Sequence, residues 1–319
     1  MITGQGLYPV YGGNGLRGFT ESYNHDGDYI LIGRQGALCG NIRKVTGKTY
    51  VTEHAIAVCA SKENETTFLQ YLFQKMKLGQ YSDQSAQPGL AVNKLLRLNI
   101  NVPSKIEQAK IAKILSLIDE RIITQNKIIE DLKKLKSAIY QELFSNQQGE
   151  EYSLSELVEI IKGQQINGNE LSENGKYYVM NGGIMPSGYY DDYNTEAGTI
   201  SISEGGNSCG YVQYNSSKFW SGGHCYTLHI KPAAPISTLF LFHFLKWKET
   251  DIMTLRIGSG LPNIQKKDLS KVSIIVPTLD KQQRIMTLLS TFQMKIEHED
   301  MYAINLNKQK QYLLLQMFI

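Results

Sequence analysis

The feature that most constrains the fold of this 319-residue chain is an internal repeat at an offset of about half its length. Residues 11–19 align with residues 181–189, with matching glycines 170 residues apart. The same offset joins Gly36 to Gly206, Cys39 to Cys209, Gly40 to Gly210 and His54 to His224. Because independent matches share one offset, the two halves are expected to fold to one plan.

Later in the chain the offset between the copies widens to 174, where Val102-Pro103 aligns with Val276-Pro277. It then stays constant through Gln108/Gln282, Ile111/Ile285, Leu115/Leu289, Leu132/Leu306 and Phe144/Phe318. One inserted residue rotates the apolar face of a helix by ~100°, whereas loops accept insertions readily. A constant offset over some 40 residues therefore predicts one long helix in each copy.

Apolar residues in both predicted helices fall on the a and d positions of one heptad frame. The expected pairing residues are Ile111, Ile114, Ile118, Ile128, Leu132, Leu135 and Ile139 in the first helix, and Ile285, Leu288, Phe292, Tyr302, Leu306 and Leu313 in the second. A helix from Ile106 to Phe144 would extend ~58 Å at ~1.5 Å per residue, more than a small domain can cover. We expect the two helices to pair antiparallel, with Arg121 and Gln125 among the polar interruptions that set the register. The alternative is that each helix packs only on its own domain.

Composition fits two domains that each bury a core. The chain is 42% hydrophobic and 20% charged, and its 19 tyrosines and 28 glycines favour turn-rich β structure. A net charge of +3 permits nucleic-acid binding without requiring it. We therefore expect an α+β chain: a β-rich domain over 1–103, a helix over 104–148, a second β-rich domain over 149–277 and a helix over 278–319.

The two copies differ at their starts. Copy two begins at Tyr152 and passes through Gly163 to Gly175, whereas copy one starts at the level of Gly6. About 25 residues of copy two thus have no counterpart. The first domain is expected to lack an opening helix or strand and to be the less stable of the two.

Cysteine usage and the N-terminal sequence indicate a cytoplasmic protein. The four cysteines form no CxxC pair, so reduced, buried thiols are expected. The first ten residues have no basic region followed by an apolar core, and no window is apolar enough to span a membrane.

Motif scans give no catalytic or metal site. Residues 13–18 match GxGxxG, but turn formers follow where a dinucleotide-binding helix should start. Gly47-Lys48-Thr49 resembles the end of a P-loop, yet Ile42 stands where its first glycine belongs. HExxH, GxSxG, an Asn/Asp-Pro-Pro-aromatic tetrapeptide and zinc spacing are absent from the sequence. The repeated histidines His54 and His224 are expected to be buried hydrogen-bonding residues.

Positions where the copies differ are candidates for sequence-specific recognition. Arg34-Gln35 aligns with Glu204-Gly205, and Arg, Gln and Glu suit guanine, adenine and cytosine edges respectively. A solvated turn would carry such residues as well. The candidate DNA-contacting residues are Arg17, Arg34, Gln35, Arg43, Lys44, Lys48, Ser203, Glu204, Asn207, Lys266 and Lys267.

Taken together, the pattern resembles the specificity subunit of type I restriction-modification systems. The most specific element is a proline followed by Gln-x-x-Ile at the head of a long helix: Pro103, Gln108 and Ile111, then Pro277, Gln282 and Ile285. The Gly-Gly turn, the later Gly-x-x-Cys-Gly and the alternation of domain and helix resemble the same family, over essentially the whole chain.

The resemblance implies that each β-rich domain is a target-recognition domain reading one half of a split site in double-stranded DNA. The helices would then fix the gap, at most ~17 base pairs for ~58 Å. It also implies docking to two methyltransferase subunits, which hold S-adenosylmethionine, and through the complex to ATP-driven restriction subunits, with no catalysis or cofactor in this chain. The alternative is a shortened assembly or decoy subunit that binds methyltransferase subunits without productive DNA recognition.

Overall fold

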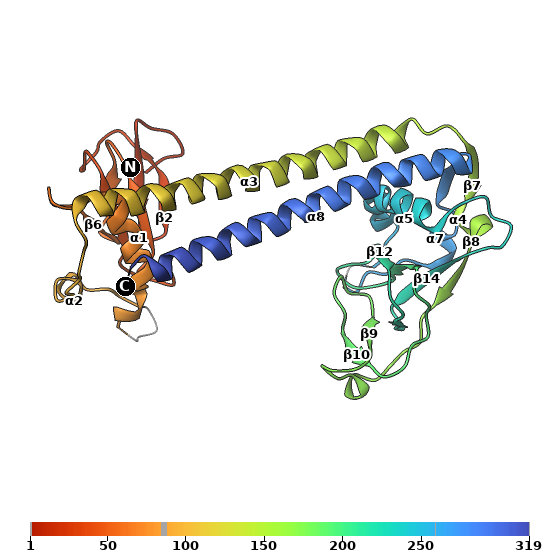
Figure 1. The fold of residues 1–319 in the computed structure, drawn as a ribbon. Coiled ribbons are helices and arrows are strands. Elements are labelled where there is room, and N and C mark those ends of the chain that lie inside the picture. Colours follow the sequence, from red (N-terminus) through yellow and green to blue (C-terminus); the bar gives the residue numbers. More distant parts are fainter. Residues whose placement is uncertain (1, 84–87, 259, 319) are drawn as a thin grey trace. The chain divides into compact units, whose positions relative to one another are not determined.

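The computed structural model describes residues 2–83, 88–258 and 260–318. The chain divides into two compact units (Figure 1). The first comprises Met1–Ile129 with His298–Ile319, and the second comprises Glu130–Glu297. Each unit therefore contains one β-rich region and parts of both long helices.

The first unit holds two three-stranded sheets. One has the order β2-β1-β5 and the other β4-β3-β6. The strands are β1 (Tyr8–Gly12), β2 (Gly15–Thr20), β3 (Tyr29–Gly33), β4 (Ile42–Val45), β5 (Tyr50–Val51) and β6 (Ala55–Val58). The short helices are α1 (Thr66–Met76), the 3-10 helix η1 (Leu78–Tyr81) and α2 (Val92–Leu95). The apolar run of β3 is buried on both faces, as expected of a central strand.

Among the described residues, the second unit repeats both sheets and adds three strands, β7, β8 and β15. Its sheets have the orders β10-β9-β13, β12-β11-β14-β8 and β15-β7. The strands are β7 (Glu150–Ser153), β8 (Val158–Lys162), β9 (Tyr177–Met180), β10 (Gly188–Tyr190), β11 (Thr199–Ser203), β12 (Val212–Asn215), β13 (Trp220–Ser221), β14 (Cys225–Ile230) and β15 (Ser273–Val276). The helices are α4 (Leu154–Leu157), the 3-10 helix η2 (Gly168–Glu170), α5 (Thr238–Trp247), α6 (Glu249–Thr254) and α7 (Lys266–Leu269).

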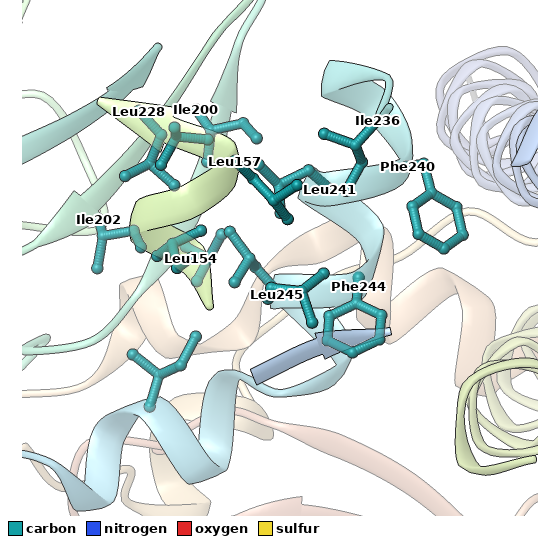
Figure 2. Close-up of a cluster of buried hydrophobic side chains, with 14 of the residues drawn as sticks. Leu154, Leu157, Ile200, Ile202, Leu228, Ile236, Phe240, Leu241, Phe244 and Leu245 are labelled. Carbon is teal, nitrogen blue, oxygen red and sulfur yellow. The ribbon is translucent and has the colours of Figure 1, made fainter. Parts of the chain in front are cut away.

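The shared topology confirms the internal repeat. In each unit a short strand pairs parallel with the first strand of its sheet, β5 with β1 and β13 with β9. Of the extra elements, β7, α4 and β8 lie in the stretch that has no counterpart in copy one, and β15 pairs with β7. Leu154 and Leu157 of α4 are fully buried between sheet residues and the α5 residues Leu241 and Leu245 (Figure 2).

The long helices are α3 (Lys105–Ser145) and α8 (Leu279–Gln316). In the first unit, Gln125 Nε2 donates to the Glu299 carboxylate at 2.5 Å, and Lys310 Nζ lies 2.6 Å from Asp119. In the second unit, Lys136 Nζ donates to Gln293 Oε1 at 2.6 Å. Later residues of α3 meet earlier residues of α8 throughout, so the expected antiparallel pairing is confirmed. The buried amide of Gln125 lies in the pairing face, as expected of a polar interruption.

The heptad assignment was wrong for four residues. Ile285 and Leu306 are buried, and the half-buried members are Ile111, Ile118, Leu132, Ile139, Phe292, Tyr302 and Leu313. In contrast, 40–48% of the surface of Ile114, Ile128, Leu135 and Leu288 is exposed. The fully covered stripe instead includes Gln108, Ala112, Leu115 and Ile129. A straight α-helix drifts ~20° per heptad from a strict 3.5-residue repeat, and each helix also packs on its own domain, which widens and turns the buried face.

The spacing between the proline and the glutamine, which is the same in both copies, has a structural reason. Gln108 Oε1 accepts from Glu65 N, ahead of α1, while its Nε2 donates to Pro103 O, both at 2.9 Å. Gln282 repeats this with Ser237 N at 2.9 Å and Pro277 O at 2.9 Å. Both glutamines are 1% exposed. Each buried amide therefore ties the start of a long helix to the domain helix beside it.

No helix in the described part of the chain combines the length and apolar character needed to cross a membrane.

Candidate nucleic-acid interface

The β1–β2 turn of the first domain packs closely against the loop that follows β3. A Cβ on Gly13 would lie 2.6 Å from the carbonyl oxygen of His54 and 3.6 Å from the amide nitrogen of Arg34. Only glycine permits this approach. The turn and the Arg34–Gln35 loop thus form one continuous surface.

Three exposed arginines surround this surface. The Arg43 guanidinium on β4 stands 3.2 Å from the place of a Cβ on Gly15, whose φ of +96° favours glycine. The side chain of Arg17 on β2 runs along Gly12. Arg34 lies in the adjoining loop, where its Nη1 is 3.5 Å from Glu53 O. Sequence reasoning had selected all three, and the structure brings them together.

Gln35 is held by His54 on the same surface. His54 Nδ1 lies 2.9 Å from Gln35 Oε1, and its Nε2 lies 3.2 Å from Glu53. The side chains of His54 and His224 are 40% and 62% exposed. The expectation that both histidines are buried was wrong, because each follows a turn at the sheet edge rather than entering the core.

In the second domain, Glu204 is held within the fold. Its side chain is 12% exposed, and Lys162 Nζ on β8 pairs with Oε1 at 2.7 Å. The hydroxyl of Tyr226 donates to the same oxygen at 3.0 Å, and burial followed by this bond raises the pKa of Tyr226 to about 12. Glu204 is therefore a partner of β8 and β14, not a freely presented base-reading group.

Ser203 is a second corrected candidate. It is 5% exposed, and its hydroxyl donates to Gly182 O at 2.6 Å. As the last residue of β11, it points into the fold rather than toward a ligand. Its exposed neighbour Asn207 lies in the following loop.

Two of the candidate lysines contact other side chains of the first domain, and two are exposed on α7. Lys44 Nζ donates to Thr67 Oγ1 at 2.9 Å and lies 3.7 Å from Asp28. Lys48 lies over the ring of Tyr23 at 4.7 Å, and copy two repeats this contact with Lys218 over Tyr193 at 4.1 Å. A contact present in both copies indicates a role in the shared scaffold. Lys266 and Lys267 are exposed at the start of α7, away from such contacts among the described residues.

The aligned positions of the two domains differ strongly in charge. At an offset of 170, the exposed arginines of the first domain are replaced in the second, giving the pairs Arg17/Ser187, Arg34/Glu204 and Arg43/Gln213. Gln213 was not selected from the sequence, although reading the same offset at Arg43 would have found it. One scaffold thus presents a cationic surface in the first domain and a polar one in the second.

The four cysteines are free thiols that differ in burial. Cys209 and Cys225 are buried as expected, and burial raises the pKa of Cys225 to about 11. Cys59, however, is exposed, because it follows the end of β6. Within residues 2–83, 88–258 and 260–318, no group of three His, Cys, Asp or Glu side chains is placed to hold a metal ion.

With this geometry in view, the chain can be placed in a protein family. A family profile described as "Type I restriction modification DNA specificity domain" matches residues 2–134 and 146–306. The chain therefore belongs to the family of type I restriction-modification DNA specificity proteins.

Two relatives are type I specificity subunits or putative ones, and one solved structure has a similar fold. The chain is 43% identical over 132 residues to the type I restriction enzyme EcoprrI specificity subunit of Escherichia coli, covering 41% of this chain but only 32% of that relative. A putative type I specificity subunit of Haemophilus influenzae is 23% identical, over 90% of this chain and 80% of its own length. The fold is similar to a crystal structure of a type I S subunit from M. genitalium, with a TM-score of 0.71 at 23% identity, covering 100% of this chain and 90% of that one.

Proposed function

We propose that this chain is the non-catalytic DNA-reading subunit of a type I restriction-modification complex. Its domains, residues 1–103 and 149–277, each read one half of a bipartite, asymmetric DNA site. It docks two methyltransferase subunits that hold S-adenosylmethionine, and the assembled complex recruits ATP-driven restriction subunits.

The observation that carries this proposal is the contrast between aligned surface positions on a repeated scaffold. A protein that reads two different half-sites needs the same fold twice with different side chains toward the bases. Arg34 and Gln35 adjoin the β1–β2 turn in the first domain, and arginine and glutamine pair bidentately with guanine and adenine. Arg17 and Arg43 flank them and supply phosphate contacts, which position the domain without reading sequence.

The second domain is proposed to read its half-site with fewer positively charged side chains than the first. Gln213 takes the place of Arg43, and Asn207 and the exposed Lys266 and Lys267 supply polar and phosphate contacts. Glu204 and Ser203 contribute by shaping the loop that carries Asn207. Binding by this domain is therefore expected to depend less on salt than binding by the first.

Methylation mapping with the reconstituted complex tests the assignment. Arg34→Ala is expected to relax one base position in a single half-site and leave the other half-site unchanged, with a loss of ~1–3 kcal/mol of discrimination. Arg284→Ala, which removes a 79% exposed arginine side chain on α8, is the matched control. Unaltered methylation by Arg34→Ala, or altered specificity in both halves, would count against the assignment.

We further propose that α3 and α8 set the gap between the half-sites. Both helices are continuous, over 41 and 38 residues. Inserting seven residues before Leu132, with a matching insertion in α8, adds ~10.5 Å of helix and is expected to widen the gap by ~3 base pairs. A gap that stays constant in the methylation map rejects this role.

A second candidate function is that of an assembly or decoy subunit. It is favoured by the first domain having three strands where the second has four in the corresponding sheet. A gel-shift selection with the reconstituted methyltransferase on random duplexes separates the two functions. Enrichment of a split motif supports sequence reading, and the absence of any enriched motif supports the decoy.

A further inference from the structure

The corresponding sheets of the two domains differ at one edge. In the second domain, β14 pairs on its outer side with β8, from Tyr226↔Lys162 to Ile230↔Val158. In the first domain the equivalent strand β6 pairs with β3, and the described residues provide no strand on its outer side. A free strand edge presents unpaired N–H and C=O groups that can pair with an added strand.

A second unpaired segment precedes α3. In the second domain, β15 pairs with β7, which leaves Ile274 0% and Val276 5% exposed. The residues aligned at an offset of 174, Ile100 and Val102, are 38% and 39% exposed and belong to no described strand. The two unpaired segments are those that β7 and β8 would cover.

An apolar cavity lies between the edge of β6 and the segment that precedes α3. Its volume is about 180 Å³. Its lining includes Ile32, Val58, Phe73, Met76, Leu98 and Ile100. In the second domain the aligned residues form one core with Leu154 and Leu157 of α4, which fill the corresponding space (Figure 2). The cavity therefore has the site and apolar lining for a pair of leucines three residues apart.

From this internal template we propose that the first domain binds, by strand addition, a segment of a second polypeptide that follows the pattern of residues 150–162. That pattern is a strand, a Leu-x-x-Leu turn and a second strand. The outer edge of β6 supplies main-chain hydrogen bonds, and the cavity takes the two leucines. The proposal does not rest on DNA reading, although both proposals use Arg34.

Charge distinguishes this occupant from a second copy of the chain. In the second domain, Lys162 at the end of β8 pairs with Glu204. The residue aligned with Glu204 is Arg34. The segment of another copy would bring Lys162 beside Arg34, whereas a partner segment with a carboxylate at this position would meet an opposite charge. The proposed occupant therefore carries Asp or Glu in the place of Lys162.

Fluorescence anisotropy with labelled 13-residue peptides and the full chain tests the proposal. The first probe has the sequence of residues 150–162, and the second carries Lys162→Glu. We expect saturable binding of both, with the second tighter by about two- to fivefold. Replacing both leucines by alanine should weaken binding by about tenfold or more. Arg34→Glu in the chain should reverse the preference between the first two probes.

Two variants of the chain locate the binding site. Ile100→Ser alters the cavity lining at a partly exposed position and should reduce peptide affinity by about tenfold. Ile184→Ser, at a 51% exposed isoleucine of the second domain, should leave affinity unchanged. Hydrogen exchange should show new protection of the β6 amides when the peptide is bound.

Three results overturn the proposal. They are no saturable binding of either peptide, equal effects of Ile100→Ser and Ile184→Ser, and protection confined to residues outside β6 and the segment 98–102. Concentration-dependent dimerisation abolished by Leu154→Ala/Leu157→Ala, with no peptide binding, would instead identify a second copy as the occupant.

Discussion

The two domains share one topology but close their cores differently. The second completes its sheet with β8 and seals its core with Leu154 and Leu157, both at most 1% exposed. The first has the same three inner strands, yet the residues that would face such a segment remain partly exposed. The comparison teaches that the inner strands and the buried glutamines Gln108 and Gln282 are common to both domains. The segment from β7 to β8 determines how completely the core is shielded from solvent.

The comparison is tested most strongly at Ile274 and Ile100, which occupy aligned positions. Ile274→Ala should lower the free energy of unfolding of the second domain by ~3 kcal/mol, because it leaves a cavity in a sealed core. Ile100→Ala should lower that of the first by less than ~1 kcal/mol. Both tryptophans, Trp220 and Trp247, lie in the second unit, so their fluorescence in urea reports that unit, and hydrogen exchange reports the first. Equal losses would show that the first core is sealed as well.

The buried glutamines Gln108 and Gln282 should contribute equally to the stability of their domains. Gln282→Ala and Gln108→Ala each remove a buried amide that bonds to one backbone N–H and to a proline carbonyl group, at an expected cost of ~2–3 kcal/mol. The exposed neighbour Gln283→Ala is the control and should change stability by less than ~0.5 kcal/mol. A loss in one domain alone would show that the buried glutamine stabilises only that domain.

A histidine-linked pH response is expected in the second domain. Burial, followed by the nearby Lys136, lowers the pKa of His243 to about 4, and its Nδ1 is hydrogen-bonded with the Tyr140 hydroxyl. Between pH 6.5 and 4 the unfolded chain takes up a proton that the folded chain does not, so stability should fall by ~3 kcal/mol as pH decreases. His243→Gln should remove this slope in tryptophan-monitored unfolding. Counted from the N-caps Glu65 and Ser237, the position of His243 is taken in the first domain by Tyr71, whose pKa is raised to about 12, so this position does not titrate between pH 6.5 and 4.

The smallest expected difference concerns the polar pair between the long helices. Lys310 pairs with the carboxylate of Asp119 in the first unit, while the aligned Lys136 bonds to the neutral Gln293 in the second. Asp119→Asn should cost ~1 kcal/mol at low salt and less at high salt, since the pair is partly exposed. Hydrogen exchange of α1 measures the loss. A salt-independent effect would indicate that the loss comes from packing rather than charge.

Much of the architecture was predictable because it is recorded as spacing along the chain. The constant offset of 174 placed both long helices, and the offset of 170 placed the matched turns and the three arginines of the first surface. The glutamines that follow Pro103 and Pro277 marked the helix starts, although the buried bonds that explain them were visible only in three dimensions. Such local patterns can be recognised in the sequence because helix period, turn geometry and hydrogen-bond reach are short-range properties.

Burial and pairing between distant residues were decided only by the tertiary structure. The heptad frame could not show that Ile128 and Leu135 remain exposed while Ile129 is covered, because each helix packs on both its partner and its own domain. Glu204 looked like a base-reading residue until Lys162, 42 positions earlier, was seen to neutralise it. The sequence by itself determined which segments repeat and where helices begin. Which side chains face solvent depends on partners that the fold brings together from far along the chain, and that information is not local.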